Sequence, residues 1–557
     1  MVFDASSKTS SGRSLNDILL AGPVLQDSLI NILLRFRFPA VVLTGDIQQM
    51  YRMVLLHDDD REYQRILWRW NSDAPIDEYK LNTVTYGTKS ASYLATKCVQ
   101  TLLLDHQNKF PETTRKALRG MYVDDVLVGA ETAEKGKLLR MQLCEIFAAG
   151  NFHLRKWASN SVAALEGVPN ADLEMKVPIE FDTSDTVKTL GIHWQPCSDE
   201  LLFSYSPTKI LQPTKRIILS QIASLFDPLG LLAPIVIKAK LVMQRLWELR
   251  VAWDSTPPGE LLHEWQVFVQ NLFALKSLQV PRRVISTNRA SRLYMHGYSD
   301  ASERAMGACV YIRSIDVAGN IASRLLCAKS KLAPIGNGRT TIPRLELCAA
   351  VILARLLKNI TEALDEEFYE IHAWTDSQVV LAWINGGASR WKTFVANRVA
   401  EITSHHPAIN WSHIRTQVNP ADLISRGVTP NQLIHNILWW CGPEWTPNST
   451  PSTTSAEVSM TSKQRQEVAR EQRAEAVTLL TIYENSFLDD MMARHYPKLQ
   501  SLLRVTARLL RFRYHEANNS RLLPFELNRA LSVYIRHVRS ILRRTSSTGE
   551  EHEFSPW

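Results

Sequence analysis

Two adjacent acids, Asp124 and Asp125, interrupt an otherwise apolar run over residues 121–128. Apolar residues on both sides of the acids predict two short strands joined by a tight turn. An Asp-Asp pair by itself usually marks a solvated turn, because Asp is a favoured turn residue. Here no glycine stands at the tip, and Tyr122-Val123 precedes the acids in apolar sequence. This context favours a functional pair over a solvated turn.

A third acid, Asp46, ends another apolar run over residues 41–46, which also predicts a strand. If the two strand regions are neighbours, Asp46 converges with Asp124 and Asp125. Nucleotidyl transfer needs two divalent metals, one to activate the attacking hydroxyl and one to steady the triphosphate. Magnesium prefers carboxylate oxygens. The three acids therefore predict a two-metal site at strand ends.

A second set of acids stands at expected strand ends and helix starts: Asp300, Glu346, Asp376 and Asp422. Each has a purely structural alternative. Glu346 suits the first turn of a helix, Asp376 a helix cap and Asp422 an Asx turn. Taken together, the four acids predict a second two-metal site, at which an activated water hydrolyses a phosphodiester.

The region around the second set alternates between strand-like and helix-like patterns. Residues 293–299 and 307–312 read as adjacent strands, and residues 344–358 have helical periodicity. Residues 370–375 predict another strand and residues 391–403 another helix. The order of strands, helix, strand and helix is typical of an α/β domain.

Composition and charge indicate the kind of partner and the cellular compartment. The net charge of +8 over 557 residues is compatible with a polyanionic partner but is weak evidence for one. The seven cysteines form no C-x-x-C pair, which favours free thiols in a reducing compartment. The N-terminus lacks the pattern of a signal peptide. The most apolar stretch, residues 225–243, is broken by Asp227, Lys238 and Lys240, so a membrane span is not expected. We expect an intracellular protein, cytoplasmic or nuclear, that is neither secreted nor membrane-bound.

Short motifs along nearly the whole chain resemble those of the Bel/Pao class of LTR retrotransposons, in the same order. Tyr122-Val123-Asp124-Asp125 is similar to the catalytic box of reverse transcriptases. The other motifs of the first half are Val2-Phe3-Asp4-Ala5-Ser6, Ser14-Leu15-Asn16-Asp17 with Gly22-Pro23, Asp46-Ile47-Gln48-Gln49-Met50-Tyr51, Thr85-Tyr86-Gly87-Thr88, Leu190-Gly191-Ile192-His193-Trp194 and Phe226-Asp227-Pro228-Leu229-Gly230. In the second half, Tyr298-Ser299-Asp300-Ala301-Ser302 and Asn419-Pro420-Ala421-Asp422 resemble the retroelement ribonuclease H domain.

The resemblance implies a pol polyprotein segment of mixed α+β and α/β class with several domains. The expected divisions are a reverse-transcriptase palm at 1–165, a thumb- or connection-like region at 166–287, a ribonuclease H-like α/β domain at 288–430, a linker at 431–475 and the truncated helical start of an integrase region at 476–557. The Ser, Thr and Pro content of residues 445–470 is typical of a linker. The tail carries no integrase carboxylates, so strand transfer in DNA integration is not expected of it.

The resemblance also implies roles for single residues. Asp46, Asp124 and Asp125 would hold Mg²⁺ or Mn²⁺ for polymerisation, and the second set of acids would hold it for RNA cleavage. Tyr51 would crowd the sugar 2′ position, with a core aromatic as the alternative. The nucleotide-binding set is completed by Tyr86 and Gly87, in the segment that contacts template and incoming nucleotide, and by Lys156, for which a solvated surface lysine is the alternative.

The expected function is that of an RNA-directed DNA polymerase, a nucleotidyltransferase, with ribonuclease H activity. Its partners would be an RNA template, a DNA primer, an RNA–DNA hybrid and deoxynucleoside triphosphates. Family members carry fingers strands before the Val2-Phe3-Asp4 segment, and their absence predicts an impaired polymerase. The alternative is a truncated or domesticated relic that binds nucleic acid without polymerase activity, or that retains only ribonuclease H activity. Intact acids at both sites favour the enzyme.

Overall fold

The computed structural model describes residues 3–174, 187–203, 212–285, 290–335, 340–405, 409–444, 460–473, 498–514 and 521–548. It divides into two compact units, Met1–Arg473 and Ala474–Trp557. Sheets and helices build the first unit, and the described part of the second unit is helical. The protein is therefore an α+β multidomain chain, as the sequence predicts.

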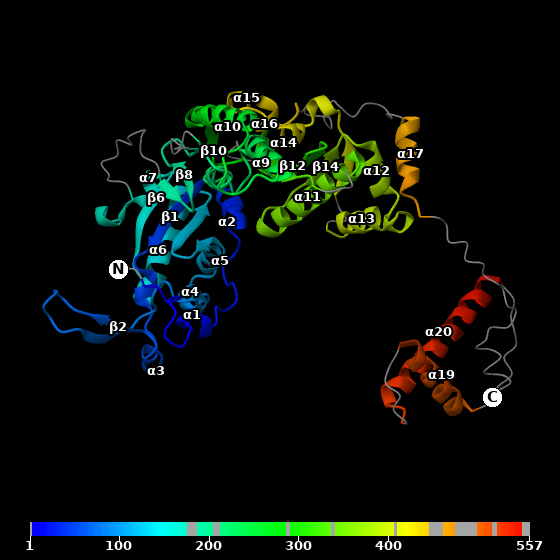
Figure 1. The fold of residues 1–557 in the computed structure, drawn as a ribbon, viewed down its shortest axis with the longest axis horizontal. Helices are drawn as coiled ribbons and strands as arrows, with labels where there is room; N and C mark the ends of the chain where they lie inside the picture. The colour runs from blue at the N-terminus through cyan, green and yellow to red at the C-terminus, as the bar shows by residue number, and fades with distance from the viewer. Residues whose placement is uncertain are drawn as a thin grey trace. The chain divides into compact units, whose positions relative to one another are not determined.

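A four-stranded antiparallel sheet in the order β4-β5-β1-β6 lies at the centre of the N-terminal part (Figure 1). Its strands are β1 (Val41–Ile47), β4 (Met121–Tyr122), β5 (Asp125–Ala130) and β6 (Leu154–Ser159), and its packed helices are α4 (Ala91–Asp105), α5 (Pro111–Gly120) and α6 (Ala133–Ala149). Leu43, Val126 and Phe147 are buried together between sheet and helices. This core holds the strand ends that carry the first set of acids.

Shorter elements surround this sheet. They are α1 (Leu15–Ile18), α2 (Leu29–Phe36), α3 (Asp58–Arg61), α7 (Val162–Leu165) and a hairpin of β2 (Arg65–Trp68) with β3 (Asp77–Lys80). The side chains of the hairpin are mostly exposed, with Trp70 at its tip 78% exposed. A two-stranded hairpin has little core of its own, which explains this exposure.

A second four-stranded sheet, in the order β10-β9-β8-β7, follows in the chain. Its strands are β7 (Val187–Thr189), β8 (Ile192–Gln195), β9 (Glu200–Leu202) and β10 (Gln279–Pro281), and the helices of this region are α8 (Lys215–Ala223), α9 (Ala233–Glu248) and α10 (Gly259–Asn271). The motif Phe226-Asp227-Pro228-Leu229-Gly230 lies in the connection between α8 and α9. There Asp227 accepts hydrogen bonds from the backbone N–H groups of Leu231 and Leu232, at 2.8 and 2.7 Å.

The third sheet has five strands in the order β13-β12-β11-β14-β15. Long antiparallel strands β11 (Ala290–Ala301), β12 (Ala305–Asp316) and β13 (Ile321–Leu332) are joined by β14 (Glu370–Thr375) and β15 (Asn410–His413), which run parallel to β11. Helix α11 (Ile342–Ala363) packs on β11 and β12, and α12 (Gln378–Asn385) and α13 (Thr393–His405) pack beside it. The sequence predicts β11 and β12 in part and β14 in full, and it predicts no strand at β13.

Two buried arginines join the first sheet to the rest of the unit. Arg37, at the end of α2, donates hydrogen bonds to the carbonyl oxygens of Leu325 and Leu326 at 2.7 Å and of Pro281 and Arg282 at 3.0 Å. Arg282 donates in return to backbone carbonyls beside α2 and forms a paired contact with Asp199. Burial lowers the pKa of Arg37 to about 9, so the guanidinium stays charged at neutral pH.

The linker expected at 431–475 needs a correction at both ends. Helices α14 (Asp422–Arg426), α15 (Pro430–Ile434) and α16 (Ile437–Cys441) continue the folded unit, and α17 (Ser462–Arg470) contacts α12. Trp439 is fully buried and donates a hydrogen bond to the carbonyl oxygen of Leu231 at 2.9 Å. Arg344 pairs with Glu471 at 2.7 Å. Apolar and ion-pair contacts thus outweigh the polar composition here, and residues 445–459 lie outside the described ranges.

The second unit contains a pair of helices, α19 (Leu499–Tyr514) and α20 (Pro524–Thr548). Leu502 and Tyr534 are buried between them, and the hydroxyl groups of Thr506 and Tyr534 share a hydrogen bond of 2.6 Å. Residues 476–497, 515–520 and 549–557 of the expected integrase region lie outside the described residues.

Candidate active sites

The first set of acids meets at the end of the first sheet. Asp46 on β1 is the direct register partner of Asp125 on β5, and Asp124 lies in the turn between β4 and β5. The turn places Val123 at a φ of 55°, a left-handed conformation that is unusual for a β-branched residue. Two hydrogen bonds hold it: the Val123 N–H donates to Gln26, and the Ile47 N–H donates to the Asp124 carbonyl oxygen. Backbone strain held in this way is a feature of functional sites.

The electrostatics of these acids reflect their proximity. Burial, together with the nearby charges of Asp124 and Asp46, raises the pKa of Asp125 to about 6. Burial and Asp46 also raise the pKa of Asp124. Asp46 itself faces two cations, with Arg155 Nε at 3.2 Å and Lys156 Nζ at 3.6 Å from its Oδ2. Lys156 is among the residues predicted from the sequence, whereas Arg155 is not, because no motif distinguishes it from other surface arginines.

The remaining predicted nucleotide-binding residues lie on two loops next to this sheet. Tyr51 follows β1 in a short 3₁₀ helix, Met50–Met53, and its hydroxyl shares a hydrogen bond of 3.2 Å with Ser92. Tyr86 is 37% exposed. Gly87 has a φ of +94°, and a Cβ there would lie 2.6 Å from the Phe3 carbonyl oxygen, so this position requires glycine. The segment 85–88 is thereby tied closely to the N-terminal loop.

The second set of acids gathers at one edge of the third sheet. Asp300 lies near the end of β11 and Asp376 directly follows β14, and the two strands are parallel neighbours with Ser299 opposite Thr375. Glu346 lies in the first turns of α11, which packs on β11. Asp422 opens α14, which contacts β11 and β12. Four acids that are far apart in sequence are therefore brought to the same edge.

These carboxyl groups influence one another. Burial raises the pKa of Asp300 to about 7, reinforced by the charges of Asp376, Asp422 and Glu346. Burial also raises the pKa of Glu346 to about 7, with Asp376 adding to the effect. The pKa of Asp422 is raised by burial and by Asp376, against the opposing charge of Arg426. Mutual repulsion of this kind favours any bound cation.

Two acids of the second set, Asp300 and Asp376, have neighbouring hydroxyl groups that orient them. The Ser425 hydroxyl donates to Asp300, and the Thr416 hydroxyl donates to Asp376 Oδ2 at 2.7 Å. Buried Asn419 donates from Nδ2 to the Ser299 carbonyl oxygen at 3.1 Å, which fastens the loop before α14 to β11. None of these three partners is predicted from the sequence, although the Asn419-Pro420-Ala421-Asp422 motif marks the loop.

The donor set suits a hard divalent cation, because all of its ligating atoms are carboxylate oxygens. Asp376 Oδ1 is buried and has no hydrogen-bond partner among the described residues, which leaves an oxygen available to a cation. As the side chains stand, no group of three or more His, Cys, Asp or Glu residues in the described ranges is arranged to hold a metal ion. Metal binding would therefore require the carboxylates of each set to turn toward a common point.

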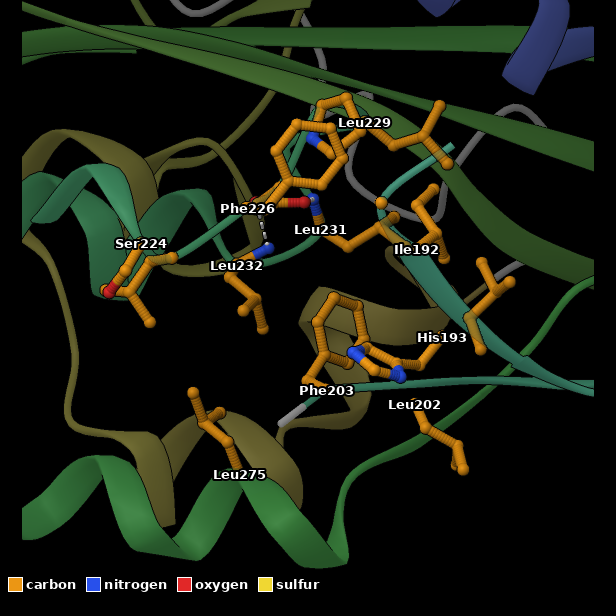
Figure 2. Close-up of a pocket in the computed structure, with 15 residues that line it drawn as sticks. Ile192, His193, Leu202, Phe203, Ser224, Phe226, Leu229, Leu231, Leu232 and Leu275 are labelled. Carbon is orange, nitrogen blue, oxygen red and sulfur yellow. Dashed lines mark hydrogen bonds between the residues drawn. The ribbon is translucent and has the colours of Figure 1, made fainter. Parts of the chain in front are cut away.

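A cavity lies beside the second sheet. This cavity, of about 290 Å³, lies between β8, β9 and the α8–α9 connection. Figure 2 shows the apolar side chains of Ile192, Phe203, Phe226 and Leu275 around it. No predicted site residue lines it.

None of the described helices has the length and apolar character needed to cross a bilayer.

Comparison with known proteins identifies one part of the chain. Residues 214–377 match the family described as the Pao retrotransposon-like RNaseH-like domain. This range runs from α8 to the residue after Asp376, so it includes Asp300, Glu346 and Asp376 and crosses the expected boundary at 287. None of the curated proteins matches the sequence.

Solved structures of the foamy viral protease-reverse transcriptase show a distant likeness. A complex with double-stranded DNA is 16% identical with a TM-score of 0.45, and a complex with an RNA/DNA hybrid is 13% identical with a TM-score of 0.44. Each alignment covers 72% of this chain, and the chain spans 62% and 48% of those two proteins. Likeness at this level carries no functional argument. The family match places a Pao retrotransposon-like RNaseH-like domain at residues 214–377, and together with the motif order on both sides of it this match supports the expected Bel/Pao-type pol segment.

Proposed function

We propose that the third sheet carries a ribonuclease H centre that cleaves the RNA strand of an RNA–DNA hybrid. The observation that carries this proposal is the placement of Asp300 and Asp376 on adjacent parallel strands, with Glu346 and Asp422 beside them. Burial raises the pKa values of Asp300 and Glu346 to about 7, and the nearby charge of Asp376 contributes to both shifts. Three of the four lie inside the matched ribonuclease H-like domain.

The residues of the chain would hold the reacting groups in place. Asp300, Glu346, Asp376 and Asp422 would bind Mg²⁺ or Mn²⁺. The bound metals would activate a water and stabilise charge on the scissile phosphate. Ser425 and Thr416 would orient two of the carboxylates through hydrogen bonds, a supporting role that typically contributes a 10- to 100-fold effect in metal sites.

The test is cleavage of an end-labelled RNA annealed to DNA, in the presence of Mg²⁺. We expect Asp376→Asn to lower the cleavage rate by more than about 100-fold, since a ligand matters more than the partner that orients it. Asp254→Asn is the matched control, because this exposed carboxylate pairs with Arg216 outside the site. Equal rates for wild type and Asp376→Asn would refute the proposal.

A second candidate activity, RNA-directed DNA polymerisation, has its own support in the first sheet. Asp46 and Asp125 are register partners, and the strained turn at Val123 presents Asp124 beside them. Tyr51, Tyr86, Gly87 and Lys156 would contact the incoming nucleotide. Lys156 already lies 3.6 Å from Asp46, so in this role it would move between the carboxylate and a phosphate.

Primer extension on an RNA template tests the second activity. We expect incorporation of deoxynucleotides that Asp124→Asn abolishes, and increased use of ribonucleotides after Tyr51→Val. Incorporation that survives Asp124→Asn would exclude this site. A chain that binds hybrid but shows neither activity would instead support the alternative of a nucleic-acid-binding relic.

A further inference from the structure

A cavity of about 700 Å³ lies where β13, α9, α11 and the start of α2 meet. Its charged lining is dominated by Lys240, Lys329, Lys331 and Arg355. The acid that also lines it, Asp227, is already engaged, because its two carboxylate oxygens accept hydrogen bonds from the backbone at 2.8 and 2.7 Å. The cavity is therefore strongly biased toward positive charge.

The three lysines are available for a ligand. Lys240 donates long hydrogen bonds of 3.4 and 3.3 Å to the carbonyl oxygen and hydroxyl of Ser330. Burial and the nearby charge of Lys329 lower the pKa of Lys240, and the charge of Asp227 partly opposes this shift. No carboxylate of the described residues forms an ion pair with Lys240, Lys329 or Lys331, whereas Arg355 pairs with Glu401. An anion bound among the lysines would relieve their repulsion.

The cavity also has a defined position relative to the second set of acids. In the third sheet Asp300 is opposite Gly307, and Gly307 is opposite Ser330, so the three residues form one row across neighbouring strands. Two strand spacings correspond to about 10 Å. A nucleic-acid duplex advances about 3.4 Å per base along its axis, so this separation is about three base steps.

We propose that Lys240, Lys329 and Lys331 form a phosphate-binding site, here called the lysine pocket, for a backbone phosphate of a nucleic-acid duplex. Lysine binds phosphate as a compact point charge, and a half-buried lysine such as Lys240 does so with less screening by solvent. In its duplex form the inference rests on the proposed ribonuclease H function, for which the pocket would anchor the strand about three base steps from the acids. A free nucleotide offers the same phosphate chemistry, and the experiment separates the two sources.

Binding is measured by fluorescence anisotropy with a labelled RNA–DNA hybrid and the full chain carrying Asp376→Asn, so that the probe stays intact. The pocket variant is Lys240→Met/Lys329→Gln/Lys331→Gln, in which Met keeps the apolar stem of Lys240. The charge-matched control is Lys276→Gln/Lys358→Gln/Lys463→Gln, which lies outside the pocket. Thermal melting checks that each variant is folded, and Lys329→Gln/Lys331→Gln alone changes only exposed side chains of the pocket.

We expect the pocket variant to bind the hybrid roughly tenfold more weakly at moderate salt and to lower the salt-dependence slope by about one to two, as for the loss of one or two phosphate contacts. The control triple should change affinity by less than about twofold. If dATP and pyrophosphate, but not the hybrid, lose affinity in the pocket variant, the phosphate site stands with a free nucleotide as its ligand. Pocket and control variants that behave alike toward every probe would overturn the inference. Hybrid cleavage by the wild type is scored separately, so failure of the pocket and failure of the proposed function give different results.

Discussion

Replacement of Arg37 tests how the first sheet is attached to the rest of the unit. Its guanidinium is 1% exposed and donates to four backbone carbonyls, two of them on β13 and two in the segment that ends in Arg282. Arg37→Met keeps an apolar chain of similar length but removes all four hydrogen bonds. Arg37→Lys keeps the charge but cannot reach four carbonyls at once, because its ammonium lacks the forked geometry of the guanidinium.

The expected loss in the free energy of unfolding for Arg37→Met is the difference between two opposing contributions. Hydrogen bonds from a charged group contribute about 1.5–3 kcal/mol each, or roughly 6–12 kcal/mol for four. The fall in the pKa of Arg37 from 12.5 to about 9 corresponds to a burial cost of about 5 kcal/mol. The difference, centred near 4 kcal/mol, is reduced by about 1 kcal/mol through the better burial of Met. We therefore predict that Arg37→Met lowers the free energy of unfolding by about 3 kcal/mol and that Arg37→Lys lowers it further.

Urea denaturation of the purified chain measures both variants, with Arg216→Met as the control. Arg216 pairs with Asp254 at the surface, so its replacement should cost less than about 1 kcal/mol. An Arg37→Met protein as stable as the control, or an Arg37→Lys protein more stable than Arg37→Met, would refute the reasoning.

Three further predictions concern single positions and pH. Gly230→Ala should destabilise the chain by at least about 2 kcal/mol in urea denaturation, because its Cβ would lie 1.8 Å from the Ala328 carbonyl oxygen at a φ of +72°; a neutral result would contradict the close approach. Ser425→Ala removes the hydroxyl that donates to Asp300 and should lower the rate of hybrid cleavage by roughly 10-fold or more, whereas Ser425→Thr should keep part of that rate. A Ser425→Ala protein that cleaves at the wild-type rate would exclude an orienting role for this hydroxyl. In EDTA the chain should lose stability as pH rises from about 4 to 7, because Asp300 and Glu346, both with a folded-state pKa of about 7, hold protons there that the unfolded chain has released. Urea melts at pH 5 and pH 8 measure this loss, which Asp300→Asn/Glu346→Gln should flatten.

Local sequence predicts the elements that carry the acids well. The apolar runs that end in Asp46 and Asp376 become β1 and β14. These predictions succeed because strand and helix periods are local properties of the chain. Strand β13 is missed, because residues 321–332 mix Arg, Ser and Lys with apolar residues and are stabilised by pairing with β12.

Contacts between distant segments could not be predicted from the sequence. The partners of Arg37 are backbone carbonyls more than 240 positions away, and a carbonyl has no sequence signature. The burial of Trp439 against Leu231 could not be predicted either, because it depends on tertiary packing that composition does not record. The acids could be named from the motifs, but their shared sheet edge and the supporting groups Ser425 and Asn419 emerge only in three dimensions.

The most direct test of the central claim is a comparison of single-turnover hybrid cleavage by wild type and by four single variants, Asp300→Asn, Glu346→Gln, Asp376→Asn and Asp422→Asn, at several Mg²⁺ concentrations. If the four acids form one two-metal centre, each variant should lose most of the cleavage activity and need more Mg²⁺ for what remains, while Asp254→Asn cleaves like wild type. A wild type that binds the hybrid and leaves its RNA strand intact, or variants that cleave at the wild-type rate with unchanged Mg²⁺ dependence, would contradict the claim.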